Sequence, residues 1–266
     1  MVITGAASGI GRALARRLSA HGCPIALADV DEHGLAETAR SIGTPTLIRR
    51  LDVRSASDVD AFAGDVRDWS PRPIGAVFNN AGVAVQASVA DGNPEDDRWL
   101  WDINFHGVVN GTRAFLPLFI GQGNGVIVNT SSVYGLLAVP HHSAYCASKF
   151  AVRGYTESLR QELAGTGVRS VTVHPGGIKT NIARDARVAV DPEGRGRTAE
   201  QIAEAFDAAA MTSPERAAET IHRGVDRGRS RILVGPDAVA VDLASRLAPS
   251  HAARALRFVE ARLSGT

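Results

Sequence analysis

Thr4-Gly5-Ala6-Ala7-Ser8-Gly9-Ile10-Gly11 is the stretch of this sequence that decides the fold. The apolar pair Val2-Ile3 precedes it and predicts a buried strand, and residues 12–20 follow with helical periodicity. Glycines between a strand and a helix let backbone N–H groups approach a pyrophosphate, and the helix dipole favours the anion. The stretch therefore predicts a pyrophosphate site, although a plain glycine-rich turn would show the same spacing.

The second predicted strand, residues 24–29, ends on the carboxylate of Asp29. Asp29 follows Gly11 by 18 residues, close to the position at which an acid binds the hydroxyl pair of an adenosine ribose. A carboxylate accepts hydrogen bonds from two hydroxyls and repels a phosphate at the same place. Asp29 thus favours NAD over NADP, which carries a 2′-phosphate on that ribose.

A second motif runs from Ser132 to Lys149, between a predicted buried strand at residues 125–131 and a helix. Tyr145 and Lys149 are four apart, so a helix places the ammonium beside the phenol, where it is expected to lower the tyrosine pKa. Ser132 follows the strand end and can donate a hydrogen bond to a substrate oxygen. The alternative is an ordinary helix that carries a buried tyrosine and a lysine whose ammonium group reaches solvent.

The remaining chain alternates strands and helices without repeats or a linker, which predicts a single domain over residues 1–266. Asp52 closes the third strand and could contact an adenine, and Asn104 lies among apolar helical residues, where it could equally be a satisfied core amide. Residues 177–212 are polar and broken by Gly and Pro, which predicts a mobile flap. The other expected elements are helices at 31–42, 55–69, 95–119, 199–209, 213 onward and 239–263, and strands at 46–53, 74–78, 169–176 and 231–234.

Composition excludes several classes of protein. The 266 residues carry a formal charge of +1, so neither nucleic acid nor an anionic membrane is expected as a partner. No apolar run reaches the ~18 residues of a membrane span, and no leader is evident. Cys23 and Cys146 lack metal-ligand spacing, so no metal is expected. We expect a reduced, cytoplasmic protein.

Taken together, the motifs resemble the short-chain dehydrogenase/reductase family, in its short single-domain branch, from Met1 to about Gly235. Several motifs occur in the family's order. They are TGAASGIG at 4–11, Asp29, Asp52-Val53, Asn79-Asn80-Ala81-Gly82, Asn104, Ser132, Tyr145-Cys146-Ala147-Ser148-Lys149, and Pro175-Gly176 with Thr180.

The resemblance implies an α/β fold of Rossmann type, a doubly wound parallel sheet of seven strands in the order 3-2-1-4-5-6-7, with helices on both faces. It implies that Tyr145 is the catalytic acid/base, Ser132 orients the substrate oxygen, Lys149 holds the nicotinamide ribose, and Asn104 holds a proton-relay water. Thr180 and the backbone of Ile178 would fix the carboxamide. The cofactor-binding set would be Gly5, Ser8, Gly9, Ile10, Gly11, Asp29, Asp52, Val53, Asn80, Ala81, Gly82, Tyr145, Lys149, Pro175, Gly176, Ile178 and Thr180.

Family members that use NADP often carry a basic residue at the positions of Ser8 or Val30, which are uncharged here, and Arg12 is expected to be solvated or beside the pyrophosphate. NAD is therefore the expected cofactor. The resemblance also implies a homodimer or homotetramer formed through the helices at 95–119 and after Tyr145. The expected substrate is a mainly apolar alcohol or ketone of moderate size, contacted by Ser132, Tyr145 and His142, although His142 could simply be an exposed loop residue.

Two alternatives stay open. One is a dinucleotide-binding regulator or scaffold that has lost catalysis, against which Asn104, Ser132, Tyr145 and Lys149 argue because all four are present. The other is a nucleotide-sugar epimerase or dehydratase, which shares the tyrosine–lysine spacing. That class usually has a different glycine spacing and a larger C-terminal substrate domain, and this sequence shows neither.

Overall fold

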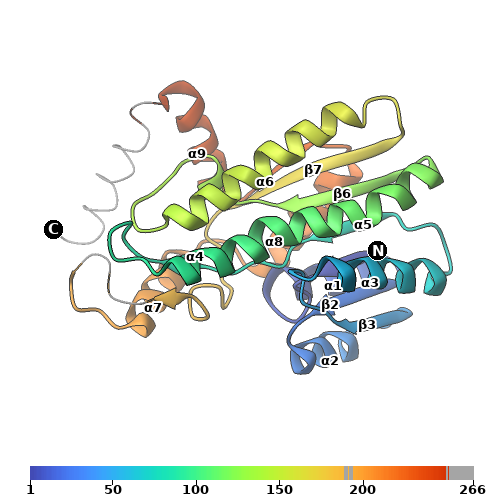
Figure 1. The fold of residues 1–266 in the computed structure, drawn as a ribbon, viewed down its shortest axis with the longest axis horizontal. Helices are drawn as coiled ribbons and strands as arrows, with labels where there is room; N and C mark the ends of the chain where they lie inside the picture. The colour runs from blue at the N-terminus through green and yellow to red at the C-terminus, as the bar shows by residue number, and fades with distance from the viewer. Residues whose placement is uncertain (189–190, 192–193, 250, 252–266) are drawn as a thin grey trace.

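A parallel sheet forms the centre of the molecule in the computed structural model, which describes residues 1–188, 191, 194–249 and 251. Within those residues seven strands follow the order β3-β2-β1-β4-β6-β7-β9 (Figure 1). β5 and β8 pair only with each other, so the seven strands counted alone run 3-2-1-4-5-6-7, and the predicted fold class is confirmed. The strands are β1 (Val2–Thr4), β2 (Ile25–Asp29), β3 (Thr46–Arg50), β4 (Ala76–Asn79), β6 (Gly125–Thr130), β7 (Val168–Pro175) and β9 (Arg231–Val234).

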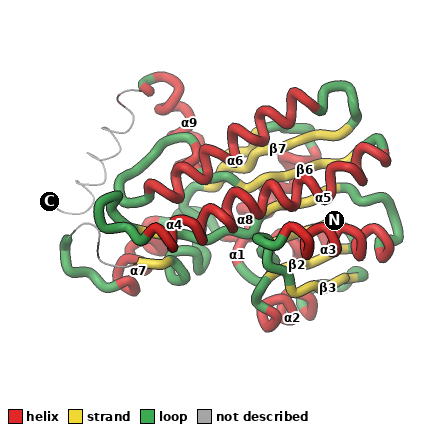
Figure 2. The backbone as a smooth tube through the Cα atoms, in the orientation of Figure 1, coloured by secondary structure: helices red, strands yellow, loops and turns green. Residues whose placement is uncertain are grey.

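Helices cover both faces of this sheet, as the tube view in Figure 2 shows. One face packs against α1 (Gly9–Ala20), α2 (Glu32–Arg40) and α8 (Pro214–Asp226). The other packs against α3 (Ala56–Trp69), α5 (Gly107–Gln122) and α6 (Ser143–Glu162). α4 (Pro94–Trp101), α7 (Ala199–Ala209) and α9 (Pro236–Leu247) lie toward one end of the sheet (Figure 1).

The short first strand is central despite its length. β1 pairs with β2 on one side and with β4 on the other. Its successive residues Val2 and Ile3 face opposite layers, and both are fully buried. Strand order reverses between β1 and β4, and in an open parallel sheet ligands bind beyond the carboxyl ends of the strands at such a point.

The structure differs from the sequence expectation in three places. The helical stretch expected at 95–119 contains one π turn, Asp102–His106, between α4 and α5. A two-stranded parallel sheet, β5 (Val85–Gln86) with β8 (Arg187–Val188), was not anticipated because strands of two residues leave no periodic pattern. The C-terminal helix expected at 239–263 begins at Pro236 and ends at Leu247 as α9, and residues 250 and 252–263 lie outside the described part of the chain.

None of the helices in the described residues combines the length and apolarity needed to cross a bilayer. The His, Cys, Asp and Glu side chains of the described residues form no group of three or more that could hold a metal ion.

A buried chain of amides and hydroxyls joins the middle strands to α6. Asn79 on β4 donates to Asn129 on β6 at 2.8 Å, and Asn129 donates to the Thr156 hydroxyl on α6 at 3.0 Å. All three side chains are at most 2% exposed. Because buried polar groups are costly when unpaired, this chain fixes the register of the strands against α6.

Asn129→Ala should lower the free energy of unfolding by about 2–3 kcal/mol, because it leaves the amide of Asn79 without its acceptor on β6. Urea unfolding monitored by circular dichroism measures this. Asn124→Ala is the control, since Asn124 is exposed and should change stability by less than about 0.5 kcal/mol. Equal effects of the two substitutions would contradict the role given to the buried chain.

Candidate active site

The glycine turn after β1 is shaped to approach a ligand closely. Gly5 and Gly9 have positive φ angles of 66° and 50°, and a Cβ on Gly11 would lie 1.9 Å from the Gly5 carbonyl oxygen. Helix α1 begins at Gly9, and the side chain of its N-cap residue Ser8 makes no capping hydrogen bond. The first N–H groups of α1 are therefore the kind of donors that bind a phosphate.

Thr4 ties this turn to the end of β4. Its hydroxyl accepts hydrogen bonds from the backbone N–H groups of Asn80 and Ala81, at 3.0 and 3.1 Å. The side-chain amide of Asn80 donates in return to the Thr4 and Gly5 carbonyls. The two segments predicted to bind the cofactor thus form one surface.

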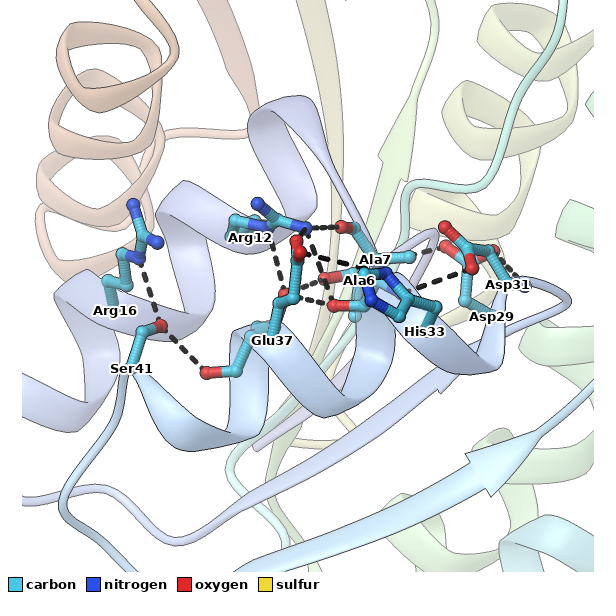
Figure 3. A network of polar contacts seen from close by, with 11 residues as sticks. Ala6, Ala7, Arg12, Arg16, Asp29, Asp31, His33, Glu37 and Ser41 are labelled. Atoms are coloured by element: carbon cyan, nitrogen blue, oxygen red, sulfur yellow. Dashed lines mark hydrogen bonds and ion pairs between the residues drawn. The ribbon is translucent and has the colours of Figure 1, made fainter.

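Asp29 holds the rim of the glycine turn at the end of β2, as Figure 3 shows. Its Oδ2 accepts from the Ala7 N–H at 2.9 Å and its Oδ1 from the Asp31 N–H at 3.1 Å. Val30 beside it is 55% exposed. The carboxylate is therefore fixed beside the glycine turn at the end of β2.

Arg12 is bound to its neighbours in the fold. Its guanidinium is hydrogen-bonded rather than solvated, because it donates to the Ala7 carbonyl, to Glu37 at 2.8 Å and to Thr38 at 3.1 Å, while a place beside the phosphates stays a prediction (Figure 3). These bonds fasten α1 to α2. They also pair the Arg12 guanidinium with the carboxylate of Glu37.

Asp52 and Val53 follow β3. Asp52 forms an ion pair with Arg54, with its Oδ2 2.6 Å from Nη2, and this hydrogen-bonded cation holds the pKa of the carboxyl below its usual value. Val53 packs against Gly107 of α5, where a Cβ would lie 2.6 Å from Cγ2 of the valine. Asp52 is thus bound to a neighbour rather than free to contact an adenine with both oxygens.

Ser132, Tyr145 and Lys149 come together beyond the carboxyl end of β6. Ser132 is 7% exposed, and its hydroxyl is close enough to the Tyr145 phenol to lower the pKa of that phenol. The Lys149 ammonium donates to the Thr130 carbonyl at 3.1 Å and lies 5.6 Å from the centre of the Tyr145 ring. The structure therefore unites the three side chains that the sequence grouped.

Burial dominates the ionisation of this pair. Loss of hydration raises the pKa of Tyr145 to about 12, which the Ser132 hydrogen bond opposes in part. Burial also lowers the pKa of Lys149 to about 8. Desolvation is thus the largest influence on the phenol, and the Ser132 hydroxyl, rather than Lys149, is the group that opposes it, so the expected effect of Lys149 on the tyrosine pKa stays a prediction.

Asn104 and Lys149 converge on Gly82. Asn104 lies in the π turn, where its Oδ1 accepts from the Val83 N–H at 2.9 Å and its Nδ2 donates to the Val83 carbonyl at 3.0 Å. A Cβ on Gly82 would lie 3.2 Å from Asn104 Oδ1 and 3.4 Å from Lys149 Nζ. A side chain at position 82 would therefore contact both polar groups, most tightly the Asn104 amide oxygen.

The turn after β7 reaches the glycine turn from the other side. Thr180 packs on Gly9, where a Cβ would lie 3.1 Å from its methyl group, and the Gly176 N–H donates to the Val234 carbonyl of β9 at 2.9 Å. A depression of about 230 Å³ lies between these segments and the start of α8, lined in part by Ser8, Gly9 and Thr180. Pro175 ends β7, and Ile178 is buried directly after the turn.

His142 lies at the mouth of this site. Its ring nitrogen Nδ1 is 3.0 Å from the Pro140 carbonyl, and its ring meets the edge of Tyr134, which in turn meets Tyr145. The Tyr134 ring thus contacts both His142 and Tyr145. His142 directly precedes the first residue of α6.

The flap is joined to α4 through Arg187, a contact that the sequence did not indicate. The Arg187 guanidinium is 2.6 Å from Asp96 and stacks 3.7 Å from the centre of the Trp99 ring, while β8 pairs with β5. Residues 189–190 and 192–193 of the predicted flap lie outside the described residues. The expectation that this segment is mobile without ligands stays a prediction.

The matches to known proteins agree with this geometry. The family model described as short chain dehydrogenase matches residues 1–191. This chain belongs to the short-chain dehydrogenase/reductase family. SadH of Mycobacterium tuberculosis is 48% identical over 252 residues, covering 92% of this chain and 89% of SadH.

Two solved short-chain dehydrogenases share the fold. One from Burkholderia phymatum, in complex with NAD, is 31% identical with a TM-score of 0.80 and covers 92% of each chain. One from Burkholderia cenocepacia, in complex with NADP, is 24% identical with a TM-score of 0.76 and covers 94% of each chain. This short-chain dehydrogenase/reductase has an uncapped helix N-terminus after the glycine turn and a hydrogen-bonded carboxylate at the end of β2.

One buried residue of this dehydrogenase escaped sequence analysis. His174 on β7 is fully buried, and its Nδ1 is 3.0 Å from the Ser132 carbonyl oxygen, to which it donates. Burial is the main cause that lowers its pKa to about 4, with Arg231 and Arg153 acting in the same direction and the Ser132 bond and Glu157 opposing them. A lone histidine before a Pro-Gly turn carries no sequence signal for this contact.

His174 should make the protein acid-sensitive. Its pKa is lower in the folded chain than the ~6.5 of an unfolded one, so the unfolded state binds the proton first and stability falls as pH drops through 6.5 toward 4. Between pH 7 and pH 5 this group should cost about 2 kcal/mol of unfolding free energy.

Urea unfolding at the two pH values measures this loss. His174→Asn, whose amide can keep the bond to the Ser132 carbonyl, should show a loss smaller by about 2 kcal/mol. His33→Asn, at a side chain that is 82% exposed, should behave like the unmodified protein. An unchanged pH dependence in His174→Asn would contradict the assignment.

Proposed function

We propose that this protein transfers hydride between NAD and the carbon of a secondary alcohol or ketone, with Tyr145 as the acid/base. The observation that carries the proposal is the meeting of Ser132, Tyr145 and Lys149 at the carboxyl edge of the sheet, beside the glycine turn. A bound nicotinamide supplies or accepts the hydride. The whole chain, residues 1–266, acts as one catalytic domain in this proposal.

The residues of the chain handle the oxygen and the proton. The Ser132 hydroxyl and the Tyr145 phenol are neighbours, so both can reach one substrate oxygen. Since the pKa of Tyr145 is about 12, the phenol holds its proton at neutral pH and is a donor to the oxygen that becomes negative as a ketone is reduced. Ketone reduction is thus the direction for which the resting protonation state is already correct.

Lys149 and Asn104 restore the proton afterwards. Lys149 has a pKa of about 8 and is cationic at neutral pH, yet it gives up a proton more readily than an exposed lysine. Its ammonium and the Asn104 amide oxygen lie around Gly82, and we assign to that gap the water through which Lys149 exchanges protons with solvent. Asn80, Ala81, Pro175, Gly176, Ile178 and Thr180 form the walls that hold the cofactor, and His142 contacts the substrate.

Tyr145→Phe should lower kcat by about 10²–10⁴ because it removes the phenol that is proposed to move the proton. Ser132→Ala should cost a similar order through the lost contact to the substrate oxygen. The measurement is absorbance of the reduced cofactor in a screen of ketones and alcohols. Tyr155→Phe, on the same helix, is the control and should keep its turnover.

Near-normal turnover in Tyr145→Phe would contradict the proposed mechanism. If the unmodified protein bound the dinucleotide but turned over no member of the screen, the binding regulator considered from the sequence would be favoured instead.

The proposed preference for NAD rests on Asp29. At an effective dielectric constant near 20, two unit charges ~4 Å apart interact by about 4 kcal/mol before screening, and a third of that gives roughly tenfold discrimination. Arg12 cannot offset this repulsion without breaking its contacts to Glu37 and the Ala7 carbonyl.

We therefore expect kcat/KM with NAD to exceed that with NADP by at least about tenfold, and Asp29→Ala to weaken the preference. Glu32→Gln is the control, because it removes an exposed carboxylate of the same segment without touching the glycine turn. Equal or better turnover of NADP by the unmodified protein would overturn the role of Asp29.

We also propose a homodimer or homotetramer. Partly exposed rings from α4, the π turn and α6 gather on one surface, where Phe105 contacts Trp101 and Tyr155 in edge-on geometry. Phe150 of α6 is 40% exposed. A two-fold axis through these helices would bury those rings against their copies.

Light scattering at micromolar concentration should give at least twice the chain mass, and a strictly monomeric mass would remove the proposal.

A further inference from the structure

The carboxylate of Asp237 reaches the turn after β7 from a distant part of the chain. Asp237 lies in the first turn of α9, and its Oδ2 accepts a hydrogen bond from the Gly177 N–H at 2.6 Å. Sixty residues separate the two. A negative charge in the first turn of a helix is favoured by the helix dipole, so α9 stabilises the carboxylate that it presents.

Two glycines make room for this carboxylate. A Cβ on Gly176 would lie 2.1–2.3 Å from three atoms of the Asp237 carboxyl group, and a Cβ on Gly235 would lie 2.4 Å from its Oδ1. Gly176 does not have a positive φ, so its backbone conformation is open to any residue. Asp237 therefore explains why residue 176 is a glycine, independently of the cofactor.

The second oxygen of the carboxylate is buried. Oδ1 has no hydrogen-bond partner among the described residues. Burial of an unpaired oxygen is unfavourable, so the charge-assisted bond from Oδ2 to Gly177 has to offset that cost. The contact is thus a specific one, unlike an exposed pair that would be screened by solvent.

The turn has a second attachment that does not involve Asp237. The Lys179 N–H donates to the Thr212 carbonyl at 3.0 Å, and the Thr212 N–H donates to the Gly177 carbonyl at 3.3 Å. A variant without the Asp237 carboxylate therefore keeps the turn attached to the segment of Thr212. What it loses is the constraint on the Gly176–Gly177 peptide.

We propose that Asp237 is a positioning residue for the nicotinamide half of the cofactor, an inference that rests on the proposed function. Its carboxylate fixes the Gly176–Gly177 peptide, and this peptide fixes the direction in which Ile178 and Thr180 leave β7. Those two residues are the ones proposed to hold the carboxamide. The adenosine half is held elsewhere, at the end of β2, and does not depend on Asp237.

Binding of two ligands to the same variants tests this separation. NADH is titrated by its fluorescence, and ADP-ribose, which lacks the nicotinamide, by calorimetry. Asp237→Ala should weaken NADH binding about tenfold and leave ADP-ribose binding unchanged within about twofold. Asp237→Asn, whose amide oxygen can still accept from Gly177, should bind NADH within about threefold of the unmodified protein.

Gly176→Ala supplies a second arm. The added methyl should weaken NADH binding in the presence of Asp237, and the double variant Gly176→Ala/Asp237→Ala should bind NADH as Asp237→Ala does, because the colliding carboxyl group is gone. A Gly176→Ala protein that binds NADH normally would overturn the proposal.

Equal weakening of NADH and ADP-ribose in Asp237→Ala, or no weakening of either, would also overturn it. The unmodified protein separates this failure from failure of the proposed function. If it bound neither ligand, the dinucleotide site itself would be refuted, together with the role of Asp237. If it binds both, the comparison between variants bears on Asp237 alone.

Discussion

A lysine ammonium buried beneath the carboxyl edge of a parallel sheet is the constraint on which this site depends. Lys149 is 3% exposed, and a charge removed from water needs polar partners close by. The Thr130 carbonyl is one, and the lack of a side chain at Gly82 leaves space for the Asn104 amide oxygen to be near. Burial lowers the lysine pKa to about 8, so the group stays cationic at neutral pH but is close to giving up its proton.

The fold brings these partners together through strand order. β4 lies between β1 and β6, so the segments that follow these three strands are neighbours at one edge. Thr4 joins the glycine turn to Asn80 and Ala81, and the pair Asn79–Asn129 holds β4 against β6. A dinucleotide lying along this edge would meet contributions from several strands at once, and each is fixed to the next by a specific hydrogen bond.

Local signals in the sequence were sufficient for most of this architecture. The strand–glycine–helix pattern at residues 2–20 and the flap helix Ala199–Ala209 were confirmed. Each depends on neighbours in sequence, such as a glycine that permits a turn or a hydroxyl that caps a helix. Spacing alone also placed Tyr145 and Lys149 on one face of α6.

What the sequence could not give depends on burial and on distant contacts. The pKa of Tyr145 rises because the fold desolvates the phenol, and the four-residue spacing carries no information on hydration. Arg12 is engaged by Glu37, 25 residues away, and Asp237 reaches Gly177 across 60 residues. The π turn adds a residue to a helix turn around Asn104, a change of register that periodicity averages out.

The central claim is direct hydride transfer at the oxygen held by Ser132 and Tyr145, and isotope transfer tests it most directly. Ketone reduction would be run with NADH deuterated at C4 of the nicotinamide, first on one face and then on the other, and the alcohol examined by NMR and mass spectrometry. The account predicts that deuterium appears at the carbinol carbon from one face only, because the walls of the site hold the ring in a single orientation. Deuterium lost to solvent, or transferred equally from both faces, would contradict it.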